Sequence, residues 1–337
     1  MTAVDLFAGC GGLTFGLKRA GFKVIAGVEI DKKRAETYEL NHPETVVFVK
    51  DIRAIKADDL SLLLPPDQKL DLIAGCPPCQ GFSRIRRRNA KRAVKDSRND
   101  LVLEFSRLVR ELRPRTVMME NVPGLEKDRR FATLVRSLRG CRYKVSWRVL
   151  DLAEHGIPQR RRRLVLLAWK GRWPPKLERI LKGPHRTVRH LLEQLPKMPK
   201  AAKAIHQVRV RRSAAVLKRI KKVPLDGGSR QGWSEGLRLA CHVESDGFKD
   251  VYGRMAWDKK APTITGGCIN PSKGRFLHPS KQRAITLFEA ARLQTFPARY
   301  RFDLSHGRYP IAAMIGEALP PRFARRAATY LKKAIRT

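Results

Sequence analysis

This 337-residue sequence lacks long apolar segments, and none of its apolar runs approaches the length needed to cross a membrane. Its first residues, Met1 to Asp5, lack the basic start and apolar stretch of a secretory signal. Cysteine is scarce, with 6 residues, which does not suggest a disulfide framework in a chain this long. We therefore expect a soluble protein of a reducing compartment, the cytoplasm, without membrane contact.

Acidic residues are also scarce, with 31 Asp and Glu against 71 Lys and Arg, so the formal charge is +40. An apolar fraction of 42% predicts a folded chain rather than a basic tail. Such an excess of positive charge favours a polyanionic partner, most simply nucleic acid. Charge alone leaves open a generally basic protein without that partner.

The N-terminal segment predicts a ligand-binding turn. Residues 3–7 read as a strand, a glycine-rich turn follows at 8–12, and residues 13–20 have helical spacing. Glycines let the backbone approach a ligand, and a helix start offers free amide donors. The spacing Phe7-x-Gly9-x-Gly11-Gly12 is neither the dinucleotide pattern nor a P-loop. A tight turn of purely structural use is the alternative.

The next two predicted strands, residues 22–28 and 45–49, are each followed by acidic residues. Glu29 and Asp31 follow the first and Asp51 follows the second. Carboxylates at strand ends can accept hydrogen bonds from ribose hydroxyls, but they repel a nearby phosphate. A cofactor that carries adenosine and a positive charge fits better, which favours S-adenosylmethionine over NAD.

A thiol follows the fourth predicted strand, residues 70–74, in the segment Gly75-Cys76-Pro77-Pro78-Cys79-Gln80-Gly81-Phe82-Ser83. Ligands of open parallel sheets bind outside the carboxyl ends of the strands, so Cys79 is a candidate nucleophile. A redox dithiol, half of a zinc site and a buried structural cysteine are the alternatives. The other cysteines lack zinc-ligand spacing, which disfavours the zinc site.

Residues 84–98 hold eight basic residues and one Asp. A solvated loop is the ordinary interpretation of such a run, but its place after Cys79 favours a lid that grips phosphates. A helix is expected at 100–112, and the fifth strand, 114–119, ends at Glu120, on the same sheet edge as Cys79.

Two further strands are expected at 143–149 and 164–169, and the alternation of Arg161 and Arg163 before the second suggests one shared face. Residues 170–282 are basic, interrupted by Pro and Gly, with β-prone pieces at 251–252 and 263–265. Helical patterning returns from 283, where Thr286 and Glu289 have capping-box spacing.

Six motifs, in family order, make the chain resemble the DNA (cytosine-5) methyltransferases. They are Asp5-Leu6-Phe7-Ala8-Gly9-Cys10-Gly11-Gly12, Pro78-Cys79-Gln80, Glu120-Asn121-Val122, Pro158-Gln159-Arg160-Arg161-Arg162-Arg163, Arg292-Leu293-Gln294-Thr295-Phe296-Pro297 and Ile315-Gly316-Glu317-Ala318-Leu319-Pro320-Pro321.

The resemblance implies an α/β fold, with a Rossmann-like domain for S-adenosylmethionine and a smaller, loop- and strand-rich target-recognition domain. We expect the first at 1–169 and 283–337, with the tail packed back on it, and the second at 170–282. It further implies transfer of a methyl group to C5 of a flipped-out cytosine in a specific double-stranded DNA sequence, leaving S-adenosylhomocysteine. No metal is expected.

The resemblance also implies site residues. The catalytic group is Cys79, Glu120, Arg161 and Arg163. The cofactor group is Phe7, Gly9, Gly11, Gly12, Glu29, Ile30, Asp51, Ile52, Pro77 and Glu317. The DNA group is Gln80, Ser83, Arg84, Arg86, Arg87, Arg88, Gln159, Thr263 and Thr265.

One position departs from the family pattern, because Glu317 stands where the family commonly has Asn. A carboxylate cannot donate the hydrogen bonds of an amide, so we expect altered cofactor affinity. An RNA cytosine-5 methyltransferase and a binding module without catalysis are the alternatives. We expect a monomer associated with the nucleoid, with any cognate restriction endonuclease acting separately; the recognition sequence cannot be read from the chain.

Overall fold

The computed structural model describes residues 1–66, 68–78, 97–171, 177, 182–195, 198–208, 210–239 and 249–336. Its contacts divide the chain into two compact units. The first comprises residues 1–155, 162–184 and 319–337, and the second comprises residues 156–161 and 185–318. Within the described residues, no helix is both long and apolar enough to span a membrane.

The first unit contains one seven-stranded sheet and its covering helices. Its strands are β1 (Thr2–Leu6), β2 (Lys23–Val28), β3 (Val46–Phe48), β4 (Leu72–Gly75), β5 (Thr116–Asn121), β6 (Lys144–Asp151) and β7 (Arg162–Trp169). Its helices are α1 (Gly12–Arg19), α2 (Lys32–Asn41), α3 (Ala57–Ser61), α5 (Leu101–Leu112), α6 (Arg129–Gly140) and α14 (Pro321–Arg336), with short 3₁₀ helices η1 (Ile52–Ala54), η3 (Ser97–Asp100), η4 (Pro123–Lys127) and η5 (Leu152–Glu154).

The strand order is β3-β2-β1-β4-β5-β7-β6. β1 to β5 run parallel, while β7 is antiparallel to β5 and to β6. β1, β4 and β5 are buried along their whole length, as expected for apolar strands covered on both faces. The predicted α/β fold is therefore confirmed. β2 and β3 follow β1 on one side and β4 and β5 lie on the other, so the chain order of the strands reverses between β1 and β4.

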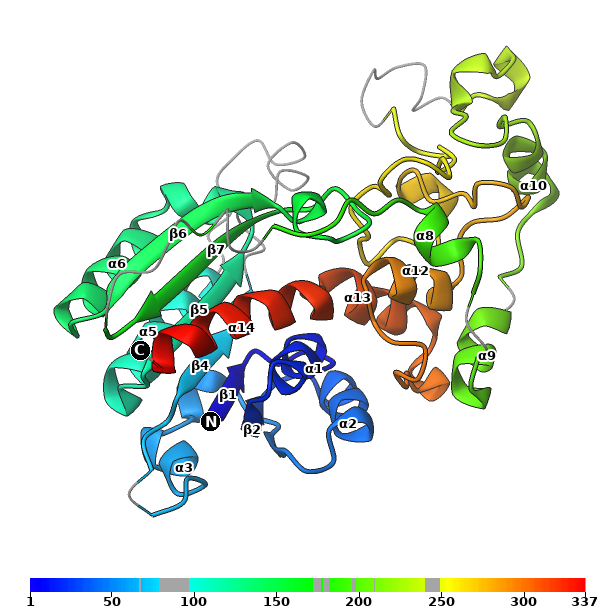
Figure 1. The fold of residues 1–337 in the computed structure, drawn as a ribbon. Helices are drawn as coiled ribbons and strands as arrows, with labels where there is room; N and C mark the ends of the chain where they lie inside the picture. The colour runs from blue at the N-terminus through cyan, green and yellow to red at the C-terminus, as the bar shows by residue number, and fades with distance from the viewer. Residues whose placement is uncertain are drawn as a thin grey trace. The chain divides into compact units, whose positions relative to one another are not determined.

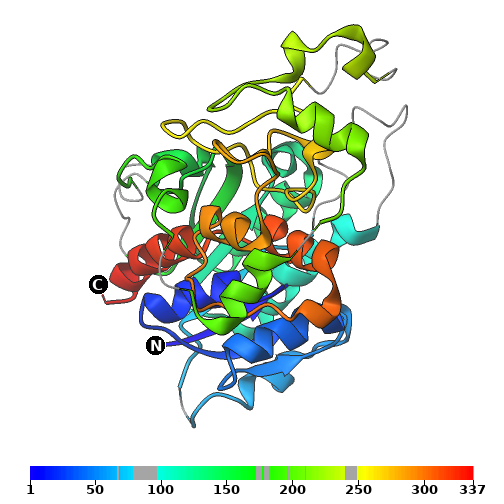
Figure 2. The same cartoon turned by 90° about the vertical axis from the view of Figure 1, so that its right-hand side faces the viewer.

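Helices cover both faces of this sheet. α14 and α1 lie on one face, and α5 and α6 lie on the other (Figure 1). α14 runs beside α1, as the red and dark blue helices in Figure 2 show. This packing is close, because a Cβ on Gly16 of α1 would lie 2.4 Å from Ala324 Cβ of α14. The C-terminal helix is thus part of the same unit as the N-terminal strand.

The second unit is built of helices and loops in its described part. Its helices are α8 (Arg189–Leu192), α9 (Lys200–Gln207), α10 (Ala214–Lys221), α12 (Leu287–Leu293) and α13 (Arg308–Glu317), with 3₁₀ helices η6 (Arg230–Gly232), η7 (Glu235–Leu237), η8 (Pro271–Lys273) and η9 (Leu304–His306). A small core around Trp233, Tyr252 and Leu277 holds its loops together. α12 begins with the predicted capping box, in which Thr286 Oγ1 accepts from Glu289 N and the Glu289 carboxylate accepts from Thr286 N.

The expectation of a strand-rich small domain was wrong for the described residues, where residues 251–252 and 263–265 form no strand. Their surroundings contain only isolated bridges, such as Gln159 with Ala261 and Arg254 with Leu277. Pro262 lacks an amide donor and stops the ladder after Ala261. The contacts group residues 283–318 with residues 185–282. The predicted division of the chain into a cofactor-binding domain and a target-recognition domain, with boundaries at 170 and 283, stays a prediction.

Candidate active site

The carboxyl ends of β1, β4 and β5 lie at one edge of the first unit's sheet. Leu6 is paired with Gly75, and Gly75 is paired with Met119. A Cβ on Gly75 would lie 2.6 Å from the Leu6 carbonyl oxygen, so only glycine allows this approach of β4 to β1. Phe7 and Cys76, which follow β1 and β4, and Glu120, near the end of β5, therefore lie along the same edge, where open α/β sheets bind ligands.

The turn after β1 has a backbone that favours glycine. Gly9 and Gly11 have φ angles of +56° and +89°, and Phe7 adopts +62° although it is not glycine. A bulky residue held in this region costs about 1–3 kcal/mol, and such strain gathers at functional sites. Gly11 is the N-cap residue of α1 and contributes no capping side chain, and Gly12 is the first residue of the helix. The Gly9 amide donates to Glu29 and the Gly11 amide donates to the Ala8 carbonyl, so hydrogen bonds within the protein hold the turn beside the start of α1.

Glu29, at the end of β2, holds this turn in place. One carboxylate oxygen accepts from Gly9 N at 2.8 Å and the other accepts from Asp31 N at 2.9 Å. Burial raises the pKa of Glu29 above its ordinary value, although the two amides oppose the shift. Next to it Ile30 is an apolar side chain with 66% of its surface exposed. The Glu29 carboxylate, a hydrogen-bond acceptor, is therefore followed directly in the chain by the exposed apolar side chain of Ile30.

The residues after β3 form a short 3₁₀ turn, η1. Asp51 is its N-cap, and its carboxylate accepts from Arg53 N at 2.9 Å and pairs with the Arg53 guanidinium at 3.1 Å. Ile52 is buried in the core. The acidic positions predicted after strands two and three are thus both engaged with nearby main-chain amides.

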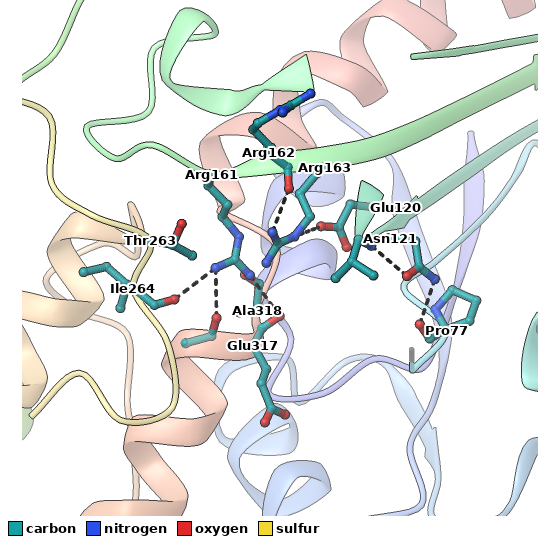
Figure 3. A network of polar contacts seen from close by, with 12 residues as sticks. Pro77, Glu120, Asn121, Arg161, Arg162, Arg163, Thr263, Ile264, Glu317 and Ala318 are labelled. Carbon is teal, nitrogen blue, oxygen red and sulfur yellow. Dashed lines mark hydrogen bonds and ion pairs between the residues drawn. The ribbon is translucent and has the colours of Figure 1, made fainter. Parts of the chain in front are cut away.

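Glu120, the penultimate residue of β5, is 6% exposed and forms an ion pair with Arg163 of β7. Arg163 Nε lies 2.7 Å from Glu120 Oε1, and Arg163 Nη1 donates to the Arg162 carbonyl at 2.8 Å (Figure 3). β5 and β7 are neighbouring antiparallel strands, with Glu120 opposite Val165. The pair places an oriented carboxyl group at the carboxyl edge of β5.

Asn121 fixes the chain that leads from β4 toward the predicted nucleophile. Its side-chain amide donates to the Pro77 carbonyl at 3.1 Å, and its side-chain oxygen accepts from Val122 N at 2.7 Å (Figure 3). Pro77 itself is buried. Cys79, Gln80, Ser83, Arg84, Arg86, Arg87 and Arg88 lie outside the described residues.

The other predicted site residues belong to the second unit. Gln159 is fully buried, donates to the Leu293 carbonyl and Gln294 Oε1, and accepts from Ile264 N. Thr263 donates its hydroxyl to the Arg160 carbonyl at 2.6 Å, and Thr265 is half-buried. Their contacts with DNA stay predictions.

Arg161 and Glu317 also lie in the second unit. Arg161 is 1% exposed and donates to main-chain carbonyls, including that of Glu317. The Glu317 side chain is exposed and points away from the Arg161 guanidinium in Figure 3. β7 begins at Arg162, so Arg161 precedes the strand that carries Arg163.

Comparison with known proteins decides the family. The model of the C-5 cytosine-specific DNA methylases matches residues 1–333. The chain belongs to this family. It is 36% identical to the Type II methylase M.HgiDII of Herpetosiphon aurantiacus, over 98% of this chain and 94% of the relative. It is 31% identical to the Type II methyltransferase M.XorII of Xanthomonas oryzae pv. oryzae, over 99% of this chain and 85% of the relative.

Solved structures support the fold of this methylase. A crystal structure titled as a prophage-encoded DNA modification methyltransferase from E. coli matches over 100% of both chains, with a TM-score of 0.77 and 23% identity. That of S. pombe Dnmt2 matches over 100% of this chain and 99% of its own, with a TM-score of 0.67 and 17% identity. The family match and the relative from Herpetosiphon aurantiacus, not these structures, show that the chain is a DNA-methylating enzyme of the S-adenosylmethionine-dependent class.

The first unit's residues fit such a cofactor. The glycine turn leaves open space next to Gly9, where an added Cβ would meet no atom within 4 Å. Glu29 offers acceptors, and exposed Ile30 offers an apolar surface for a flat ring. Within the described residues no cluster of three or more His, Cys, Asp or Glu side chains could hold a metal ion.

Sequence reasoning missed a buried chain of hydroxyls behind the glycine turn. Thr14 Oγ1 donates to Asp5 Oδ2 at 2.7 Å and lies 2.8 Å from the Tyr38 hydroxyl. Burial raises the pKa of Asp5 to about 7, and the Thr14 hydrogen bond opposes the shift. An acidic residue inside an apolar strand was the available signal, because burial of a carboxylate requires partners.

Proposed function

We propose that this methylase transfers a methyl group from S-adenosylmethionine to C5 of a flipped-out cytosine in double-stranded DNA, through a covalent bond between Cys79 and C6. The observation that carries the chemistry is the buried Glu120–Arg163 ion pair at the carboxyl edge of β5. It supports a role for Glu120 at the base, because an oriented carboxyl group there can hold or protonate a ring nitrogen.

The proposed reaction begins with attack of the Cys79 thiolate on C6, and the electron pair of the C5–C6 double bond moves into the ring. Glu120 holds or protonates N3, so that the ring can accept this charge. S-adenosylmethionine, when bound, supplies the electrophilic methyl group that C5 takes. Loss of the C5 proton and departure of the thiolate then restore the aromatic ring. The basic residues that follow Cys79 in the sequence would favour the thiolate.

Arg163 has two tasks in this proposal. Its guanidinium keeps the Glu120 side chain oriented through the 2.7 Å contact, and its remaining donors can contact the base oxygen. Asn121 has a positioning task, since it holds the Pro77 carbonyl two residues before Cys79. A base inside a duplex cannot reach such a site, so the target nucleotide has to leave the stack.

The proposal assigns cofactor binding to ten residues: Phe7, Gly9, Gly11, Gly12, Glu29, Ile30, Asp51, Ile52, Pro77 and Glu317. Glu29 is the strongest of them, because its carboxylate is fixed by two amides and retains lone pairs for ribose hydroxyls. DNA as substrate is supported by the family and by the charge of +40. A monomeric state, a separately acting endonuclease and nucleoid association stay predictions.

The test uses radiolabelled S-adenosylmethionine and a duplex that contains 5-fluorocytosine, which traps the enzyme on C6. Denaturing electrophoresis should show a labelled protein–DNA adduct, and the Cys79→Ser variant should form none. An equal adduct in that variant would remove Cys79 from the mechanism. Methyl transfer to transfer RNA but not to duplex DNA would instead favour the RNA enzyme, and DNA binding without transfer to either would favour a binding module.

A further inference from the structure

The C-terminal end of α13 is capped by side chains from elsewhere in the second unit. The last carbonyls of a helix lack donors within the helix and need partners. Gln294 Nε2 donates to the Ile315 carbonyl at 2.6 Å and approaches those of Gly316 and Ala318 at 3.3 and 3.2 Å. Gln294 is fully buried, so this cap is an internal feature of the unit.

Arg161 completes the cap with its guanidinium. Nη1 donates to the Gly316 carbonyl at 3.0 Å, and Nη2 donates to the Ala318 carbonyl at 3.2 Å and approaches that of Glu317 at 3.5 Å. A cation at this position complements the helix dipole. Nη1 also donates to the Ile264 carbonyl at 3.0 Å, so one guanidinium joins the 315–318 turn to the 263–265 loop (Figure 3).

Two further contacts tie the same segments. Gln159 accepts from Ile264 N at 3.0 Å and donates to Gln294 Oε1 at 2.7 Å. The backbones also touch, since a Cβ on Gly316 would lie 2.1 Å from the Thr265 carbonyl carbon. We call the three side chains Gln159, Arg161 and Gln294 the carbonyl clamp. Through it, the turn that carries Glu317 and the loop that carries Thr263 and Thr265 form one hydrogen-bonded piece.

We propose that Arg161 is a positioning residue, in place of the catalytic role predicted for it, and that the carbonyl clamp couples cofactor binding to DNA binding. The inference rests on the proposed function, in which Glu317 binds the cofactor, and on the predicted contacts of Thr263 and Thr265 with DNA. Because the clamp joins the two segments, a displacement of either segment by its ligand is transmitted to the other, so each ligand changes the binding free energy of the other. The coupling has to be reciprocal.

The experiment measures the dissociation constant of S-adenosylhomocysteine by calorimetry, with and without a saturating duplex that the wild-type protein methylates. The ratio of the two constants is the coupling factor, for which we expect about tenfold in the wild type. Arg161→Lys keeps the charge but cannot span the carbonyls, and Gln294→Met removes the amide donors. Each should lower the factor to about twofold or less, and the double variant should lower it no further, because both act on one clamp.

Arg136→Lys, on the exposed side of α6, is the matched control and should retain the wild-type factor. If Arg161→Lys does not fold, Gln294→Met carries the test. A factor unchanged in the folded variants would overturn the proposal, as would a loss of kcat in Arg161→Lys with an unchanged factor, which is the signature of a residue that touches the base. A wild-type protein that neither binds S-adenosylhomocysteine nor methylates DNA would instead overturn the proposed function itself.

Discussion

Arg161 and Arg163 stand two residues apart in one motif but have different partners. Arg163 pairs with the Glu120 carboxylate in the first unit, whereas Arg161 donates to main-chain carbonyls around the end of α13 in the second. The first contact orients a charged group, and the second connects segments of backbone. The difference teaches that an arginine in a functional motif can orient a reactive side chain or hold the backbone together. The group that accepts its hydrogen bonds indicates which of the two roles it has.

A substitution in the Glu120–Arg163 ion pair should have the largest effect on activity. Glu120→Gln keeps the size of the side chain but removes the charge that pairs with Arg163 and the proton-transfer capacity, so kcat should fall by about 10²–10⁴. Methyl transfer to duplex DNA under single-turnover conditions measures this. Glu104→Gln is the matched control, since Glu104 pairs with Arg107 at 2.8 Å on α5, and its activity should be unchanged. Equal rates for the two variants would exclude Glu120 from the chemistry.

The segments that the carbonyl clamp joins also meet in a close backbone contact at Gly316. Gly316→Ala should destabilise the protein by about 2–3 kcal/mol, because the new methyl group would overlap the Thr265 backbone. Gly140→Ala is the control: Gly140 is the last residue of α6, and no atom lies within 4 Å of its added Cβ. That change should be neutral or stabilise by up to about 1 kcal/mol. Denaturant unfolding measures both, and equal effects would argue against a tight joint at Gly316.

Two buried groups, Asp5 in the first unit and His278 in the second, should make contributions to stability that change with pH in opposite directions. The pKa of Asp5 in the first unit is raised to about 7, mainly by burial, from an ordinary value of 3.8. Between these values the folded state holds a proton that the unfolded state has lost, so this group's stabilisation is lost as pH rises. Burial lowers the pKa of His278 in the second unit to about 4, from 6.5, so its contribution to stability increases as pH rises from 4 to 6.5.

Asp5→Asn tests the first of these contributions. The variant should gain about 2 kcal/mol of unfolding free energy relative to the wild type between pH 5 and pH 7, because the amide does not titrate. Denaturant unfolding at the two pH values measures the gain. His278→Gln should show the opposite trend over pH 4 to 6.5. A constant difference between Asp5→Asn and wild type would contradict a raised pKa in Asp5.

Glu317 should give the smallest effect. Its main-chain carbonyl approaches the clamp, while its exposed side chain points away from Arg161. Glu317→Asn should therefore change the dissociation constant of S-adenosylmethionine by about three- to tenfold, roughly 1 kcal/mol, and leave the coupling factor intact. Glu317→Gln separates loss of charge from change of length. If the wild-type affinity is undetectable and Glu317→Asn restores it, the expectation of a modest effect is wrong.

Much of the first unit was predictable from local pattern. The strands and glycine turn were expected because apolar runs end in turn residues and acidic groups, and the structure has β1, β2, β4 and β5 within two residues of their expected ends. The second unit was less predictable. Its β-prone pieces, residues 251–252 and 263–265, form no strand, and only neighbouring residues such as Ala261 and Arg254 form isolated bridges. Pro262 interrupts any ladder next to 263–265, where the Arg161 side chain donates to the Ile264 carbonyl.

The sequence by itself determined the family, the order of the elements and the residue types at the edge of the sheet, because those depend on motif spacing and apolar periodicity over short distances. Only the tertiary structure decided which groups meet. It paired Arg163 with Glu120, turned Arg161 and Gln294 toward carbonyls at the end of α13, and buried Asp5 beside Thr14. These contacts join residues up to 157 positions apart, which no local pattern specifies.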